Sequence, residues 1–144
     1  MKRKMKKIDY QKQGIKNRLS GARFELKVRS DLESKGWIVD RWTNNVEFPE
    51  GISKQLIEAR NYGKLIKAKS FMGRSRTNGF PDFIAFKSLH MGFIVQGVEC
   101  KSNGYLDKIE KEKCVWYLEN NIFSKILIAS KGTKRGEIKY VEFK

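Results

Sequence analysis

The stretch from Gly79 to Tyr105, GFPDFIAFKSLHMGFIVQGVECKSNGY, decides what this chain is expected to fold into. It holds two runs rich in Val, Ile and Phe, separated by a short turn at residues 88–92. Apolar, β-branched and aromatic runs around a short turn are typical of two antiparallel β-strands. We therefore predict a β-hairpin with strands near residues 80–87 and 93–101.

Charged residues interrupt the end of this hairpin that lies away from the turn. Asp82 follows Pro81 at the start of the first strand, and Glu99 and Lys101 close the second. Because side chains alternate between the two faces of a strand, Glu99 and Lys101 lie on the same face. The hairpin would place Asp82 near Glu99, so that two carboxylates and one ammonium group converge. The alternative is an ordinary strand end whose charged residues are solvated.

A third carboxylate, that of Glu25, falls among the apolar positions of a predicted helix. Carboxylates held close together repel each other unless a cation lies between them. Oxygen ligands of this kind suit Mg²⁺ or Mn²⁺, which polarise a phosphoryl oxygen and activate a bound water molecule. We therefore expect a metal site, with Lys101 orienting the water or stabilising charge on a phosphate. The alternative for Glu25 is an ion pair with Arg29, one helical turn later.

The rest of the chain predicts further helices and strands around the hairpin. A first helix is expected over residues 17–35, with Ser20 as a candidate N-cap and Gly36 at its end. Along the chain, this helix and the later elements follow the order α-β-insert-β-β-α-β-β. This order predicts an α/β fold with a mixed sheet flanked by helices. The expected buried stripe of the first helix is Leu19, Ala22, Leu26, Val28 and Leu32, and the apolar markers of the helix at 107–121 are Ile109, Val115, Trp116 and Leu118. The other expected elements are strands at 36–42, 124–130 and 138–143, helices at 52–59, near 64 and at 107–121, and a loop at 71–79.

Length and charge narrow the classes of function. The chain has 144 residues, of which 40% are hydrophobic, which suits a single domain. We expect a single domain at 18–144 with an insert at about 44–79, preceded by a basic, flexible arm at 1–17. The net charge of +15 favours nucleic acid as the partner, with an anionic membrane surface second. The alternative is a lysine-rich protein with no polyanionic partner.

Other features of the composition exclude several kinds of site. No apolar run is long enough to span a membrane, and the basic arm lacks the apolar segment of a secretory leader. A cytoplasmic location, in the host cell if the source is viral, is therefore expected. Cys100 and Cys114 are expected to be plain core thiols. His90 is the single histidine, so a structural zinc site and a His-based triad are both poorly supported.

The acidic residues and the lysine resemble the E…PD…ExK pattern of PD-(D/E)XK nucleases. Glu25 lies on a first helix, Pro81-Asp82 opens one strand, and Glu99-Cys100-Lys101 closes the next. More narrowly, residues 21–42 look like the opening of archaeal-type Holliday junction resolvases. The matching residues there are Gly21, Glu25, Val28, Gly36-Trp37 and Arg41. The resemblance extends over about residues 18–130.

This resemblance implies a restriction-endonuclease-like fold and hydrolysis of DNA phosphodiesters with Mg²⁺, for which Mn²⁺ can substitute. It implies that Asp82, Glu99 and the carbonyl of Cys100 are metal ligands. Glu25 would help to bind a metal, directly or through water, and Lys101 would act on the attacking water. It also implies a homodimer that resolves four-way DNA junctions by paired symmetric cuts, a reaction of DNA recombination and repair.

Residues that contact DNA are expected near this site, and two departures from the family are visible. Ser75 and Thr77 are the candidates for the serine that the resolvases carry in the insert region. Glu112 and Lys113 stand about where the family often has a glutamine. The alternatives are a nuclease of the same fold that acts on other DNA structures, and a non-catalytic basic DNA-binding protein. The expected DNA-binding residues are Arg18, Arg23, Arg41, Arg74, Ser75, Arg76 and Thr77.

Overall fold

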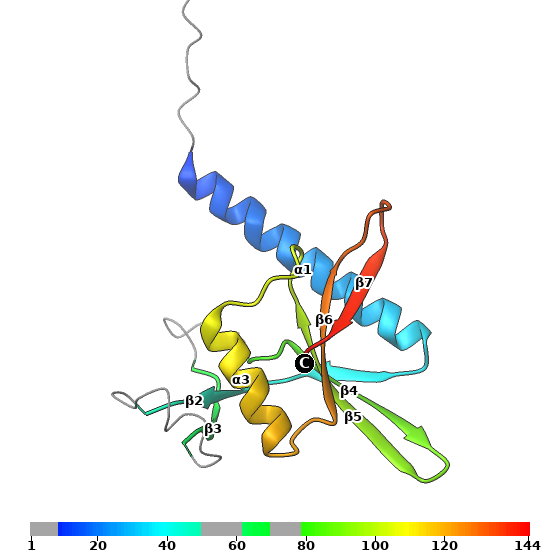
Figure 1. Cartoon of the computed structure of the whole chain (residues 1–144). Helices are drawn as coiled ribbons and strands as arrows, with labels where there is room; N and C mark the ends of the chain where they lie inside the picture. The colour runs from blue at the N-terminus through cyan, green and yellow to red at the C-terminus, as the bar shows by residue number, and fades with distance from the viewer. Residues whose placement is uncertain (1–8, 50–61, 70–78) are drawn as a thin grey trace, which may run out of the picture.

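A mixed five-stranded sheet with a helix against each face forms the core of the structure (Figure 1). The computed structural model describes residues 9–49, 62–69 and 79–144. The strand order is β1-β4-β5-β6-β7, and only β5 and β6 run parallel to each other. This confirms the predicted α/β class with a mixed, helix-flanked sheet. The elements of this core are α1 (Tyr10–Ser34), β1 (Ile38–Arg41), β4 (Phe83–Leu89), β5 (Gly92–Cys100), α3 (Lys108–Glu119), β6 (Lys125–Lys131) and β7 (Ile138–Glu142).

The predicted hairpin is present as β4 and β5. Their antiparallel register runs from Leu89 opposite Gly92 at the turn to Phe83 opposite Val98 at the other end. One step further along this register places Asp82 beside Glu99. The convergence of the two acidic residues, expected from the sequence, is therefore confirmed.

Each face of the sheet has its own apolar cluster, because successive side chains of a strand point to opposite faces. Helix α1 covers one face and α3 covers the other, on either side of the sheet in Figure 1. Strand β6 contributes to both clusters, as expected for a nearly continuous apolar strand. The buried residues of the α1 face are Phe24, Val28, Leu32, Val39, Phe83, Ala85, Val98 and Ala129. Those of the α3 face are Val46, Phe80, Cys114, Tyr117, Phe123, Ile126 and Ile128.

Helix α1 begins earlier than the sequence predicted. Its N-cap is Asp9, whose side chain accepts a hydrogen bond of 3.2 Å from the Lys12 amide, whereas Ser20 lies in the middle of the helix. Residues 10–17, predicted as part of a flexible arm, are therefore helical, and residues 1–8 lie outside the described part of the chain. The reason is that residues 10–17 lack proline and are rich in Lys and Gln, which favour helices.

The predicted buried stripes of both helices were partly wrong. On α1, Val28 and Leu32 are buried as predicted, but Leu19 and Leu26 are 52% and 67% exposed and Ala22 is exposed too. Phe24 takes their place, since residues spaced by four lie above one another on the side that faces the sheet. On α3, Cys114 and Tyr117 are the buried residues, whereas the predicted markers Ile109 and Val115 are exposed.

The described part of the insert forms a small two-stranded sheet of β2 (Asn44–Glu47) and β3 (Lys64–Lys67). The prediction of a helix near residue 64 was therefore wrong. The Ala68 amide extends this pairing by donating to the Thr43 carbonyl at 2.9 Å. The helix predicted at 52–59 and nearly all of the loop predicted at 71–79 lie outside the described residues.

The Tyr117 hydroxyl links α3 to the start of the hairpin, which gives a test of the fold. It donates to the Phe80 carbonyl at 2.6 Å and accepts from the indole N–H of Trp42 at 3.0 Å. Tyr117→Phe leaves both partners without this oxygen, so we expect the free energy of unfolding to fall by ~1–3 kcal/mol in urea denaturation. The matched control is Tyr105→Phe, whose residue is 78% exposed, with a change below ~0.5 kcal/mol. Equal losses in the two variants would contradict this account.

Candidate functional site

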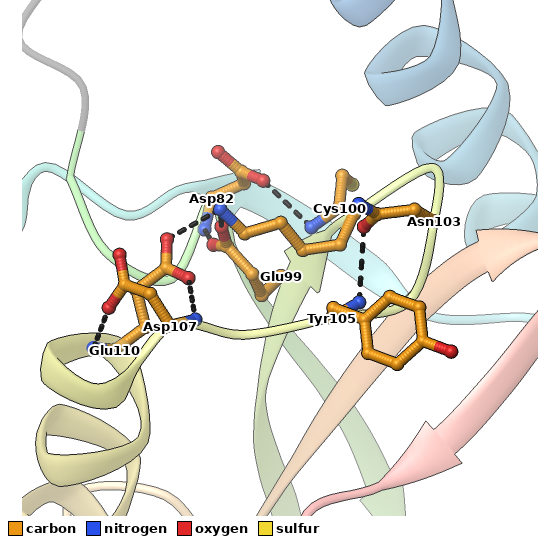
Figure 2. Close-up of polar contacts among 8 residues, drawn as sticks. Asp82, Glu99, Cys100, Asn103, Tyr105, Asp107 and Glu110 are labelled. Atoms are coloured by element: carbon orange, nitrogen blue, oxygen red, sulfur yellow. Dashed lines mark hydrogen bonds and ion pairs between the residues drawn. The ribbon is translucent and has the colours of Figure 1, made fainter.

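Asp82 and Glu99 lie side by side where the hairpin ends, and backbone amides hold both carboxylates (Figure 2). The Asp82 amide donates to Oε2 of Glu99 at 3.1 Å. In return, the Cys100 amide donates to Oδ2 of Asp82 at 2.8 Å. The Asp82 carbonyl accepts from the Trp42 amide at 3.1 Å, which ties the same point to the end of β1. The two acids are thus positioned by main-chain pairing rather than by mobile side-chain contacts.

The electrostatics of this pair are unfavourable for two negative charges. The pKa of Glu99 is raised to about 9, first by burial and then by the neighbouring Asp82 charge, whereas Lys101 acts in the opposite direction. Burial also raises the pKa of Asp82, although the Cys100 amide and Lys101 act in the other direction. The side chain of Glu99 is only 7% exposed, so water screens this repulsion weakly. A cation placed against both carboxylates would relieve it.

Lys101 lies beside the pair and bridges two acidic side chains. Its ammonium nitrogen is 3.5 Å from Oε1 of Glu99 and donates a hydrogen bond to Oε1 of Glu110. Burial lowers the pKa of Lys101, but the hydrogen bond to Glu110 and the charge of Glu99 outweigh it and raise the pKa above the ordinary value. The side chain is therefore an ammonium group at neutral pH and can donate hydrogen bonds but not accept a proton.

Glu110 is a site residue that the sequence reasoning did not find. It lies in the first turn of α3, where Asp107 and Glu110 form a reciprocal capping box. Figure 2 shows its carboxylate directed toward the same space as Asp82 and Glu99. The sequence interpretation looked to Glu112 and Lys113 in this helix. The signal that was available is the D-x-x-E spacing of residues 107–110, which is typical of a helix start and fixes the glutamate at the sheet end.

Glu25 approaches the site from α1, on the other face of the sheet. Its carboxylate Oε2 lies 3.8 Å from Nη2 of Arg41 at the end of β1. Its charge is one of the influences that raise the pKa of the Cys100 thiol, after burial and the charges of Asp82 and Glu99. Arg29, the partner considered from the sequence, donates to Glu33 and to the Val39 carbonyl. Glu25 therefore lies within electrostatic reach of the site, and its role as a metal ligand stays a prediction.

The two cysteines are free thiols, as predicted. Cys114 is buried in the cluster beneath α3, where burial raises its thiol pKa to about 12. Cys100 is the last residue of β5, and its backbone is fixed by the Asp82 carboxylate on one side and by pairing with Ala129 on the other. Its carbonyl as a metal ligand stays a prediction.

The donor set fits a hard divalent cation held by few protein ligands. Within the described ranges, no group of three or more His, Cys, Asp or Glu side chains gathers at metal-binding spacing. Mg²⁺ commonly binds through one or two carboxylates and keeps several waters. Asp82 and Glu99 supply two carboxylates on a rigid frame, so Mg²⁺ or Mn²⁺ suits them better than a zinc ion, which requires three or four protein ligands.

The predicted DNA-binding residues are only partly described. Arg18 and Arg23 are exposed on α1, and Arg41 is exposed at the end of β1, close to Glu25. The other four, Arg74, Ser75, Arg76 and Thr77, lie outside the described residues.

Comparison of the chain with protein-family models, with curated proteins and with solved structures found no match. Among the described helices, none is long and apolar enough to cross a membrane.

Metal binding at this pair predicts a change in thermal stability. A ligand that binds only the folded state at ~100 times its dissociation constant stabilises it by about 2.7 kcal/mol. We expect Mg²⁺ or Mn²⁺ to raise the melting temperature of the wild type, and to lose most of this effect in Asp82→Asn and in Glu99→Gln. The control is Glu119→Gln at the exposed end of α3, which should respond as the wild type does. A full metal response in Asp82→Asn would argue against this site.

The raised pKa of Glu99 predicts how stability depends on pH without metal. The folded state holds the Glu99 proton up to about pH 9, whereas the ordinary pKa is 4.5. The free energy of unfolding of the wild type should therefore fall as pH rises through this window. Glu99→Gln stays neutral, so in EDTA at pH 8 we expect it to be more stable than the wild type by at least ~1 kcal/mol, with the difference shrinking toward pH 5. Urea denaturation at both pH values measures this, and a constant difference would contradict it.

Proposed function

We propose that this chain is a metal-dependent endodeoxyribonuclease with a restriction-endonuclease-like fold. The observation that carries the proposal is the buried pair of Asp82 and Glu99. Reciprocal hydrogen bonds from backbone amides hold the two carboxylates, and the ammonium group of Lys101 lies beside them. A carboxylate pair at this degree of burial destabilises the fold, and a perturbed pKa of this kind is typical of functional sites. The order of these residues, with Glu25 on the preceding helix, also supports the resemblance to PD-(D/E)XK nucleases.

Each residue would have a distinct role in phosphodiester hydrolysis. Bound Mg²⁺ supplies Lewis acidity and lowers the pKa of a water molecule. Asp82 and Glu99 would hold the ion, with the Cys100 carbonyl as a further ligand. Lys101 would donate hydrogen bonds to the attacking water or to a non-bridging phosphate oxygen, because its raised pKa keeps it charged. Glu110 would hold the Lys101 side chain in this position.

The substrate that we favour is branched DNA. The net charge of +15 favours a polyanion, and the resemblance to resolvases favours a four-way junction cut symmetrically by a homodimer. Arg18, Arg23 and Arg41 are exposed and available for phosphate contacts.

A non-catalytic DNA-binding protein is the second candidate. One observation favours it: the Lys101 side chain is already bonded to Glu110. Chelation separates the two candidates, since EDTA should stop cleavage but leave simple binding intact.

The test is cleavage of a four-way junction in Mg²⁺, beside a linear duplex of matched sequence. We expect paired symmetric nicks near the crossover and little cutting of the duplex. Asp82→Asn and Lys101→Ala should each lower the cleavage rate at least ~100-fold, since metal and cation contacts contribute several kcal/mol to transition-state stabilisation. Glu119→Gln should cut at the wild-type rate.

Three outcomes would change the assignment. Near wild-type cleavage by Asp82→Asn would refute the proposed site. Equal cutting of duplex and junction would indicate a nuclease of another specificity. Tight DNA binding without cleavage in either Mg²⁺ or Mn²⁺ would favour the non-catalytic candidate.

A further inference from the structure

A basic groove lies between α1 and the hairpin of β6 and β7, outside the carboxylate site. Two adjoining hollows of about 480 Å³ and 420 Å³ form it, and they share Phe24, Lys27 and Lys131 in their walls. Figure 1 shows α1 crossing beside this hairpin. The basic residues that line the groove are Lys16, Arg23, Lys27, Lys131, Lys134 and Arg135.

The positive charge of the basic groove is not neutralised by the described protein. None of the six basic side chains forms an ion pair with a described residue. Glu137 is the one acidic residue among those described in its lining, and its carboxylate accepts from the Lys134 amide at 3.0 Å and from the Thr133 hydroxyl at 3.3 Å. Six like charges gathered in a concave surface attract a polyanion.

The local structure holds these residues in place. Lys16, Arg23 and Lys27 are spaced by seven and four residues, so they lie on one face of α1. Beneath them Phe24 is only 6% exposed and anchors the helix in the core. The Tyr140 hydroxyl of β7 donates to Asp31 of α1 at 2.6 Å, which fixes the hairpin against the helix. The groove is therefore a built feature of the fold.

The basic groove lies at the same end of the sheet as the carboxylate site, but on the face covered by α1, whereas Lys101 contacts Glu110 of α3. Strands β5 and β6 are parallel, so their last residues, Cys100 and Lys131, lie at the same end of the sheet. The Lys131 amide donates to the Ser102 carbonyl at 3.3 Å, and the Lys101 amide donates to the Ala129 carbonyl at 2.9 Å. A polyanion bound at Lys101 would therefore reach the groove by passing around this end of the sheet.

We propose that the basic groove binds the backbone phosphates of a DNA arm that extends beyond the phosphate held at Asp82 and Glu99. The path of the arm rests on the proposed function, whereas binding itself does not require cleavage. DNA fits better than an anionic membrane, because the charges line a hollow. Membrane-binding faces project apolar side chains, and Leu19 is the one large apolar residue of the described lining that is highly exposed.

The test compares two triple variants that lose the same charge. The groove variant is Lys27→Ala, Lys131→Ala and Arg135→Ala, all exposed residues. The control variant is Lys64→Ala, Lys125→Ala and Lys144→Ala. Lys125 and Lys144 lie toward the opposite end of the strands from the groove. Circular dichroism and thermal melting first verify that both variants fold, and if the groove variant does not, the double variant Lys27→Gln, Arg135→Gln replaces it.

Binding is measured in EDTA by fluorescence anisotropy of a labelled four-way junction over a series of salt concentrations. Each lost phosphate contact lowers the slope of log K against log salt by about 0.9. We expect the groove variant to bind at least ~10-fold more weakly at ~100 mM salt, with a slope smaller by about 2–3. The control variant should match the wild type.

The outcomes separate this inference from the proposed function. Wild-type affinity and salt slope in the groove variant would overturn it, even if the wild type cleaves DNA in Mg²⁺. DNA binding that depends on the groove residues but occurs without cleavage would support the groove inference. It would count only against the proposed nuclease function. Groove-dependent binding to phosphatidylserine vesicles that exceeds binding to DNA would overturn the groove inference in favour of a membrane partner.

Discussion

The antiparallel pairing of β4 with β5 is the constraint on which the candidate site depends. Its register brings Asp82 next to Glu99 at the end away from the turn, and the amides of Asp82 and Cys100 then bind the two carboxylates reciprocally. A shift of one residue would turn Glu99 to the opposite face of the sheet. The register is held by apolar side chains on both faces, so the packing of the core also positions the polar site.

The cost of this arrangement is electrostatic. Burial raises the pKa of both acids. The hydrogen bonds from backbone amides and the charge of Lys101 lower these pKa values, but only in part. Strongly shifted carboxyl pKa values of this kind are more common at functional sites than elsewhere in proteins. The ion pair of Lys101 with Glu110 adds a link to α3, so three separate elements meet at the carboxylates: the start of β4, the end of β5 and the first turn of the helix.

The parallel pairing of β5 with β6 connects this site to the rest of the surface. Because of this pairing, both strands end at the same end of the sheet. Lys101 follows β5, and Lys131 is the last residue of β6. The long helix α1 passes the same end and presents Lys16, Arg23 and Lys27 toward the β6–β7 hairpin. Positive charge that is scattered in the sequence is thereby collected in one groove on the α1 face, at the same end of the sheet as the carboxylates.

The sequence by itself determined the hairpin, the convergence of Asp82, Glu99 and Lys101, and the mixed α/β architecture, because alternation and short turns are local properties. It did not determine which side of α1 is buried, the strand at Lys64–Lys67, or the contact of Glu110 with Lys101. These features depend on residues far away in the chain. Packing against the sheet buries Phe24 and leaves Leu26 exposed, and β3 forms by pairing with β2. The basic groove is likewise a product of tertiary structure, since only packing brings α1 against a hairpin more than a hundred residues later.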